Sequence, residues 1–279
     1  MNLKLQYKFA LPGAPAASKK PDPARILYAE CPLCASKHFV PLLESDCSGH
    51  PLYKPSIPKR MQWMRCVDCT HVFTDGYFTR QALEIVFSET HPHQLAGANY
   101  EGQRPIAARM VETVLPFASE GRWLDVGFGN AALLFTAQEY GFEPVGLDLR
   151  AANVERLKQA GISAYCRDIA ELEQGLDYDV ISMADVLEHM PYPATGLRAA
   201  HRLLRPGGVL LVSMPNMDSA VWQMLSAENA NPYWGELEHY HNFGRRRLYE
   251  LLQENGLRPV RYGISERYRA CMEVVALKT

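Results

Sequence analysis

The sequence predicts an α/β protein in which helices cover both faces of a parallel sheet, preceded by a small cysteine-rich module. From residue 104 onward, short apolar segments alternate with segments that have helical periodicity. A glycine-rich turn at residues 127–129 joins one apolar segment to the next helix, and two Cys-x-x-Cys pairs lie upstream. We therefore expect a flexible N-terminal arm (1–26), a cysteine module (27–79), a linker or lid (80–103) and a main domain (104–279).

The composition is that of a globular protein with a hydrophobic core. The chain has 279 residues, of which 47% are hydrophobic and 22% charged, enough for one large domain and a small one. A net charge of −2 without a long basic stripe gives no general attraction to nucleic acid or an anionic membrane. There is no apolar stretch of the ~20 residues that a membrane span needs, and no unbroken signal-peptide core. These features predict a cytoplasmic protein without a nucleic-acid or membrane partner, and they leave the oligomeric state open.

The two cysteine pairs predict a structural zinc site. Cys31 and Cys34, and then Cys66 and Cys69, each place two thiolates on one tight turn, as tetrahedral zinc binding requires. Seven cysteines, an odd number, fit reduced thiols and a metal better than a disulfide framework. A site of four thiolates has no open position, so we expect a structural metal. The alternative is reduced cysteines without metal, and the possible substitute ligands are His38, Cys47, His50 and His71.

The segment between the cysteine pairs is longer than in most zinc ribbons. It spans the 31 residues 35–65, against a usual ~15–20. It must hold a hairpin or an ordered loop, and its prolines favour the loop. After the second pair we expect a short helix at 80–88 and a loop at 97–102.

The main domain begins with a helix from Arg104, with Pro105 in its first turn. The chain ends in two strands, 260–264 and 271–277, which we expect to add an antiparallel strand at the edge of the sheet. Between them, strands are expected at 122–126, 144–147, 162–166, 179–183 and 209–214, and helices at 131–140, 154–160, 194–204 and around 248–252.

The glycine turn has the features of a cradle for a nucleotide-type cofactor. Gly127 and Gly129 allow backbone conformations closed to other residues, and the N–H groups of the following helix face the ligand. With Ala132 and Asp148 they fit the dinucleotide fingerprint, so a NAD-dependent dehydrogenase is one interpretation. Asp125 favours a different cofactor, because an acid just before the turn suits a cationic group such as an α-ammonium. Alternatively, Asp125 only caps the turn.

Six segments resemble, in order, the motifs of class I S-adenosylmethionine-dependent methyltransferases. This resemblance covers roughly residues 105–279. It implies a Rossmann-like, seven-stranded sheet with its last strand antiparallel, and S-adenosylmethionine as the cofactor. The six segments are 125–130, 146–148, 167–168, 178–182, 185–189 and 204–210.

The resemblance also implies roles for individual residues. Gly127 and Gly129 would border the methionine part of the cofactor, with Asp125 near its amino group. Asp148 would bind the ribose hydroxyls. Asp168 and Ile169 would flank the adenine, unless Asp168 has only a local structural role. The remaining expected cofactor-binding residues are Phe128 and Leu149 and, on the floor near the sulfonium, Met183, Ala184 and Asp185.

The whole chain resembles a bacterial subgroup that carries such a cysteine module before the methyltransferase domain. That subgroup includes sugar C-methyltransferases acting on nucleotide-linked deoxysugars, and residues 238–243 resemble its Glu-His-x-His-x-Phe segment. We therefore expect methyl transfer to a small molecule, such as a nucleotide sugar or another polysaccharide or natural-product intermediate.

An acceptor atom that carries a proton at neutral pH needs a general base, and a histidine suits this role. The catalytic candidates are His239 and His241, with Glu238 to orient an imidazole, and His189 is a further candidate. Each of them is otherwise an ordinary structural histidine. The aromatic residues expected in the acceptor pocket are Tyr100 and Tyr240.

The cysteine pairs also leave a different class of function open. Zinc ribbons often bind RNA or a protein partner, so the chain is alternatively such a binding protein. The acidic balance and the absence of a basic surface with interleaved aromatic residues argue against RNA.

Overall fold

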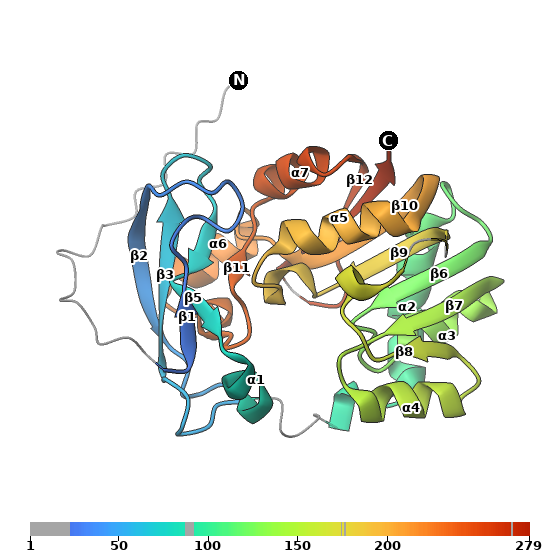
Figure 1. Cartoon of the computed structure of the whole chain (residues 1–279), viewed down its shortest axis with the longest axis horizontal. Coiled ribbons are helices and arrows are strands. Elements are labelled where there is room, and N and C mark those ends of the chain that lie inside the picture. The colour runs from blue at the N-terminus through green and yellow to red at the C-terminus, as the bar shows by residue number, and fades with distance from the viewer. Residues whose placement is uncertain (1–22, 87–91, 174, 176, 269) are drawn as a thin grey trace.

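The computed structural model describes residues 23–86, 92–173, 175, 177–268 and 270–279. Most of the expected N-terminal arm, and the end of the helix expected at 80–88, lie outside these residues. A smaller module rich in strands lies beside a larger α/β domain (Figure 1). None of the described helices is both long and apolar enough to cross a membrane.

The larger domain is built on a seven-stranded sheet of order β12-β13-β10-β9-β6-β7-β8. Six strands run in the same direction, whereas β13 is antiparallel to both its neighbours. This confirms the expected sheet with its last strand antiparallel. The strands are β6 (Gly121–Val126), β7 (Phe142–Leu147), β8 (Ser163–Tyr165), β9 (Tyr178–Ala184), β10 (Leu204–Pro215), β12 (Leu257–Ile264) and β13 (Cys271–Lys278).

The position of the antiparallel strand differs from the expectation in one respect. β13 lies between β10 and β12, so the strand at the edge is β12. The first six residues of β13 are buried, whereas β12 is mostly half-buried or exposed. A strand that is apolar on both faces is stable inside a sheet, and this explains the order.

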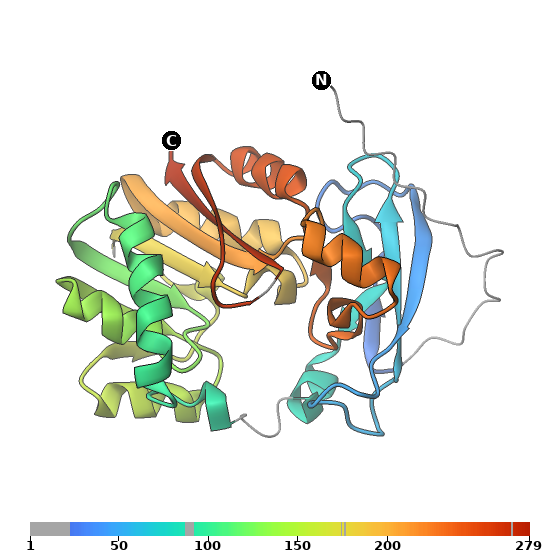
Figure 2. The ribbon, with the colours of Figure 1, turned by 180° about the vertical axis from the view of Figure 1, so that it is seen from behind.

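Helices cover both faces of this sheet (Figures 1 and 2). Leu197 of α5 and Leu251 of α7 belong to the core on one face, and Met110 of α2 and Ala137 of α3 belong to the core on the other. The helices are α2 (Tyr100–Val114), α3 (Ala132–Glu139), α4 (Ala151–Gln159), α5 (Pro193–Leu203), α6 (Ala220–Ala227) and α7 (Arg245–Glu254), with 3₁₀ turns η1 (Pro92–Gln94), η2 (Ile169–Glu171), η3 (Leu187–His189) and η4 (Pro232–Gly235).

Helix α2 begins one turn earlier than expected. The Gln103 N–H donates to the Asn99 carbonyl, which places Pro105 inside the helix and not in its first turn. The loop expected at 97–102 is therefore partly helical. Helix α6 was not expected from the sequence.

The smaller module contains a four-stranded sheet of order β11-β4-β3-β2 and a pair of strands, β1 and β5. The segment between the cysteine pairs is a hairpin of two long strands, which corrects the expected ordered loop. Pro41 lies where the pairing register shifts, a position that tolerates a residue without an N–H, and the other prolines lie in the connection between the strands. The elements are β1 (Arg25–Leu27), β2 (Phe39–Asp46), β3 (Arg60–Cys66), β4 (Val72–Thr74), β5 (Gly76–Phe78), α1 (Arg80–Val86) and β11 (His241–Asn242).

Strand β11 comes from the main part of the chain and completes the sheet of the module. It pairs antiparallel with β4. Nearby, the Tyr28 hydroxyl donates to the Pro191 carbonyl at 2.7 Å, and the Trp63 indole N–H donates to the Trp234 carbonyl at 2.9 Å. The module therefore holds the segment from η4 to β11 in place.

Candidate functional site

The glycine turn has the backbone that its sequence predicts. Gly127 has φ +66° and Gly129 has φ +53°, both in the left-handed region that favours glycine. A Cβ at Gly127 would lie 3.0 Å from a methyl group of Val186. The Gly127 N–H donates to the Leu147 carbonyl at 2.6 Å, which ties the turn to β7.

A cavity with an empty volume of about 470 Å³, its open mouth included, lies over this turn. Five expected cofactor-binding residues line it: Asp125, Gly127, Phe128, Gly129 and Ala184. Gln103 of α2, Asn130 and Arg267 line it as well, and none of them was assigned to the cofactor from the sequence. The cavity therefore matches the part of the site that was assigned to the methionine end of the cofactor.

Asp125 is buried at the end of β6. Its carboxylate accepts a hydrogen bond of 2.6 Å from the Ser182 hydroxyl. Burial raises the pKa of Asp125 to about 7, against the opposing effects of Ser182 and Arg267. A buried acid with this pKa ionises readily when a cationic ligand binds beside it.

The other expected cofactor residues lie outside the cavity, at or near the carboxyl ends of β7, β8 and β9. Asp148 is buried, and its two carboxylate oxygens accept hydrogen bonds from the Arg150 guanidinium at 2.9 and 2.7 Å. Asp168 accepts from the Ala170 N–H at 2.8 Å and so caps η2. Ile169 and Met183 are fully buried, whereas Leu149 is 73% exposed. Contacts of these residues with ribose and adenine stay predictions.

A cluster of acids and histidines lies just beyond β9; we call Asp185, Glu188, His189, Glu238 and His239 the acidic-histidine cluster. Asp185 has φ +57° and pairs with the Arg267 guanidinium at 3.1 Å. Glu188 is 1% exposed, and neither of its carboxylate oxygens has a hydrogen-bond partner among the described residues. Burial raises the pKa of Glu188 well above its usual range.

The two histidines of this cluster are in contact. The rings of His189 and His239 pack edge to face, with centroids 4.7 Å apart. The His189 ring Nδ1 lies 3.1 Å from the Glu238 carbonyl oxygen and 3.8 Å from its carboxylate. Burial lowers the pKa of His239 well below its usual range, so that its ring is neutral at physiological pH. The Glu238 carboxylate thus lies within ion-pair distance of His189, whereas the described residues show no such pair with His239 or His241, which it was expected to orient.

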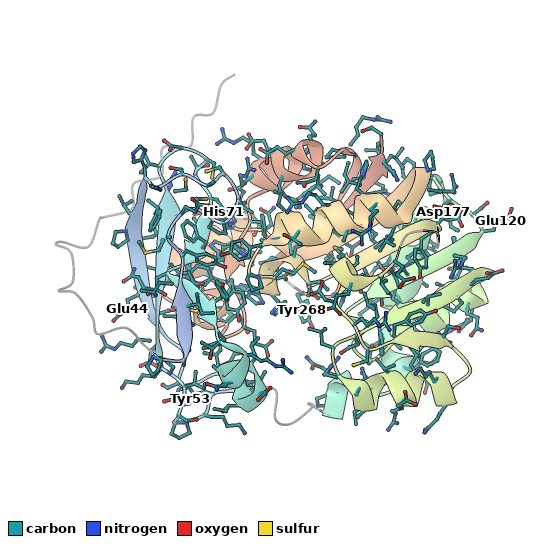
Figure 3. The ribbon with its side chains drawn as sticks, in the orientation of Figure 1. Glu44, Tyr53, His71, Glu120, Asp177 and Tyr268 are labelled. Carbon is teal, nitrogen blue, oxygen red and sulfur yellow. The ribbon has the colours of Figure 1, made fainter. Side chains whose placement is uncertain are left out.

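His241 is engaged at both ring nitrogens. Nε2 lies 2.8 Å from the Met190 carbonyl, which can only accept, so this nitrogen carries the proton. Nδ1 therefore accepts from His71 Nε2 at 3.0 Å. His71 lies on the side of the module that faces the main domain (Figure 3). This arrangement connects the module to the main domain and argues against His241 as a general base.

The two tyrosines that were expected in the acceptor pocket have structural partners. The Tyr100 hydroxyl donates to Glu139 of α3, and the Tyr240 hydroxyl accepts from the Phe78 N–H at 3.3 Å. Neither tyrosine lines the cavity.

Arg267 and Glu188 are the important residues that the sequence analysis did not single out. Arg267 lies on the loop between β12 and β13, where no periodicity or motif marks it. Its neighbour Tyr268 lies between the module and the main sheet (Figure 3). Glu188 belongs to one of the six motif segments. Its position directly before His189 was the one sequence feature that could have marked it as a site residue.

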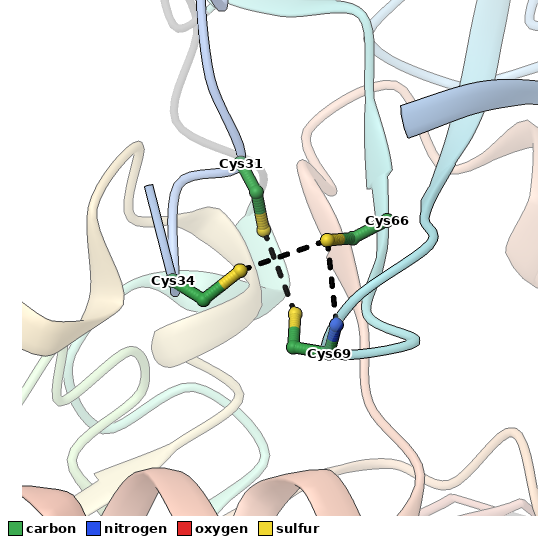
Figure 4. A group of neighbouring side chains, drawn as sticks. All are labelled: Cys31, Cys34, Cys66 and Cys69. Carbon is green, nitrogen blue, oxygen red and sulfur yellow. Dashed lines mark hydrogen bonds between the residues drawn. The ribbon is translucent and has the colours of Figure 1, made fainter. Parts of the chain in front are cut away.

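The four cysteines of the two pairs meet in the module (Figure 4). The Cys31 and Cys69 sulfurs are 3.7 Å apart, and the Cys34 and Cys66 sulfurs are 3.6 Å apart. A tetrahedron with metal–sulfur bonds of about 2.3 Å has edges of about 3.8 Å, so the four sulfurs fit one ion. The residues that follow the pairs, Ala35 and Thr70, both have a positive φ, so the two turns are alike.

A family profile described as "Methyltransferase domain" matches residues 99–262. Among curated proteins, the chain is similar to a ubiquinone biosynthesis O-methyltransferase of Ruegeria pomeroyi, with 34% identity over 54% of this chain and 65% of the relative. The enzyme of the same name from Sodalis glossinidius is 34% identical over 36% of this chain and 44% of the relative. The chain thus spans less than two thirds of the length of these relatives.

Two solved structures share the fold. The 1,6-didemethyltoxoflavin-N1-methyltransferase of Burkholderia thailandensis, with bound S-adenosylhomocysteine, has a TM-score of 0.55 and 19% identity, over 76% of this chain and 97% of its own. The magnesium protoporphyrin IX methyltransferase of Synechocystis, also with bound S-adenosylhomocysteine, has a TM-score of 0.52 and 17% identity, over 64% of this chain and 84% of its own.

Proposed function

The chain belongs to the class I S-adenosylmethionine-dependent methyltransferases, and on this premise we propose that it methylates an oxygen atom of a small-molecule acceptor. One observation carries the proposal. Ala184 lines the cavity, and the acidic-histidine cluster begins at the next residue, Asp185, which pairs with the cavity residue Arg267. An acceptor beside that cluster lies next to the methyl group of a cofactor in the cavity. The names of the curated relatives support oxygen as the acceptor atom.

We propose that the cavity holds the methionine end of S-adenosylmethionine. The glycine turn supplies backbone N–H groups, and Asp125 supplies a negative charge for the α-ammonium group. Asp148 would bind the ribose hydroxyls once the cofactor displaces or shares its contact with Arg150. Asp168 and Ile169 would border the adenine at the end of β8.

The reaction is an in-line displacement, in which the acceptor oxygen bonds the methyl carbon and the sulfonium leaves as a thioether. Most of the rate enhancement comes from holding the two reactants in line. A hydroxyl must lose its proton to become a good nucleophile. We propose that the acidic-histidine cluster promotes the loss of this proton. His239 and Glu238 belong to the cluster, and His241 lies outside it.

We also propose that Cys31, Cys34, Cys66 and Cys69 hold a structural zinc ion. The sulfur separations close to a tetrahedral edge and the two similar turns support this proposal. With four protein ligands the ion has no position left for a substrate.

The test combines binding and turnover of the whole chain. Calorimetry should show that S-adenosylhomocysteine binds and that NADH does not. Radiolabelled S-adenosylmethionine should then label an acceptor from a panel of phenols, nucleotide sugars and other hydroxylated metabolites. Absence of S-adenosylhomocysteine binding would contradict the proposed function. Labelling of a sugar carbon, and not an oxygen, would correct the acceptor atom.

A further inference from the structure

We propose that Glu188, His189 and His239 bind a divalent cation, which holds the acceptor oxygen beside the methyl group of the cofactor. This inference rests on the proposed methyl transfer and adds a second metal site, separate from the four cysteines. Its ligands come from η3 and from the segment between η4 and β11, two parts of the chain that meet where β9 ends.

Glu188 is the first reason for this proposal. Its side chain is buried, and both of its oxygens lack a hydrogen-bond partner within the described part of the chain. A buried carboxylate without partners is costly unless it is neutralised by a proton, a cationic side chain or a metal ion. The two histidines beside it supply the other ligands that a metal ion needs.

The tautomers of the histidines fit metal binding. His189 Nδ1 faces the Glu238 carbonyl oxygen, which can only accept, so Nδ1 carries the proton and Nε2 keeps its lone pair. Histidines that bind metals are commonly oriented by such a hydrogen bond to a backbone carbonyl. In His239, the buried Nδ1 has no partner among the described residues.

The three side chains are close enough to share one ion. One ligand atom from each of Glu188, His189 and His239 lies within 4.8 Å of the others. Ligand atoms bonded at about 2.1 Å to one tetrahedral ion are about 3.4 Å apart. Small side-chain rotations therefore bring the three atoms to bonding distance.

The local charge also calls for a cation. The cluster contains three carboxyl groups, those of Asp185, Glu188 and Glu238. Its two imidazoles, those of His189 and His239, carry no charge when they bind a metal ion. Arg267 is the cationic side chain that pairs with it, through Asp185. Two negative charges therefore remain when all three acids are ionised, and a divalent ion balances them. One carboxylate and two imidazoles are a ligand set that suits first-row divalent metals such as Mn²⁺, Fe²⁺ or Zn²⁺.

Three protein ligands leave coordination positions open, in contrast to the cysteine site. An acceptor hydroxyl that binds there loses its proton to solvent more readily, because the ion stabilises the resulting oxyanion. That oxyanion then bonds the methyl carbon as the carbon–sulfur bond breaks. The acceptors that this site favours therefore carry a hydroxyl able to bind a metal.

The test is a titration with MnCl₂ of the whole chain carrying one zinc ion per chain, in which the electron paramagnetic resonance signal measures free Mn²⁺. We expect one bound Mn²⁺ per chain, and a loss of affinity of about tenfold or more in Glu188→Gln and in His239→Asn. The matched control is Glu171→Gln, a surface acid on η2, which should bind Mn²⁺ like the unchanged protein. Calorimetry with S-adenosylhomocysteine shows whether each variant is folded.

The outcomes separate this inference from the proposed function. If the unchanged protein binds S-adenosylhomocysteine but no Mn²⁺, the cation site is wrong and the methyltransferase assignment stands. The same conclusion follows if a folded Glu188→Gln or His239→Asn variant binds Mn²⁺ as tightly as the control. If S-adenosylhomocysteine itself does not bind, the proposed function fails first.

Discussion

At the scale of single residues, Asp125 shows how burial prepares a charge for a ligand. Its raised pKa of about 7 means that it is partly protonated in the empty protein. Because the unfolded pKa is 3.8, the folded state binds more protons between about pH 4 and pH 7, and the stability of the empty protein falls as pH rises through this range. The cofactor's ammonium group favours the ionised carboxylate.

We therefore predict that the affinity for S-adenosylhomocysteine increases as pH rises through about 7. Asp125→Asn should remove this pH dependence and weaken binding about tenfold or more, since a charged hydrogen bond contributes about 1.5–3 kcal/mol. Calorimetry on either side of neutral pH measures both effects. A variant that binds as tightly as the unchanged protein would show that Asp125 only supports the turn.

The pair of His71 and His241 predicts sensitivity to acid. Burial lowers the pKa of His241 from 6.5 to about 4 and that of His71 well below 6.5. The unfolded chain binds more protons in this range, so stability should fall as pH decreases from about 6.5 to about 4. His71→Gln keeps a donor for His241 but cannot become charged. Its melting temperature should therefore decline less steeply with acid, and an equal slope would refute the role of the pair.

At the scale of elements, β7 packs so closely against α4 and the glycine turn that position 146 has no room for a side chain. A Cβ on Gly146 would lie 2.5 Å from a Leu157 methyl group and 2.8 Å from the Phe128 ring. We expect Gly146→Ala to destabilise the protein by about 1–3 kcal/mol and to weaken cofactor binding, because Phe128 belongs to the turn.

The matched control for this variant is Gly263→Ala in β12, where an added Cβ has no neighbour within 4 Å. Urea unfolding and S-adenosylhomocysteine calorimetry compare the two variants. Equal stability and affinity in both would show that the space around Phe128 adapts without cost.

The elements also show how far the sequence could predict the structure. The strands of the main sheet were predictable, because their apolar runs and the turns between them are local features. The hairpin of β2 and β3 was missed because its prolines suggested a loop, although they lie at a register shift and in the connection. The two-residue strand β11 has no periodicity and exists only because β4 pairs with it.

The same limit applies to the site. Asp125 and the glycines were predictable because the turn is contiguous in the sequence. The proximity of Glu188 to His239, and the position of Arg267 in the lining of the cavity, depend on packing between distant segments. Local patterns therefore predict the glycine turn and its acid, whereas the side chains that packing brings beside them have no local signal.

At the scale of the whole molecule, the cysteine module and the acidic-histidine cluster are parts of one structure. Strand β11 joins the module's sheet two residues after His239, and Trp63 of the module contacts Trp234 ahead of Glu238. The cavity over the glycine turn, in contrast, is lined among the described residues by those from α2 onward. Disorder of the module should therefore displace the cluster and leave the cavity intact.

We predict that removal of the proposed zinc ion, by Cys66→Ser or by a chelator, largely abolishes methyl transfer while S-adenosylhomocysteine still binds. Cys47→Ser is the matched control, since this buried cysteine lies outside the group of four. Metal analysis should show one zinc fewer per chain in Cys66→Ser alone. Parallel loss of cofactor binding and transfer would mean that the module supports the whole fold. Selective loss of transfer would make it a structural part of the acceptor site, because the module holds the segment that carries His239.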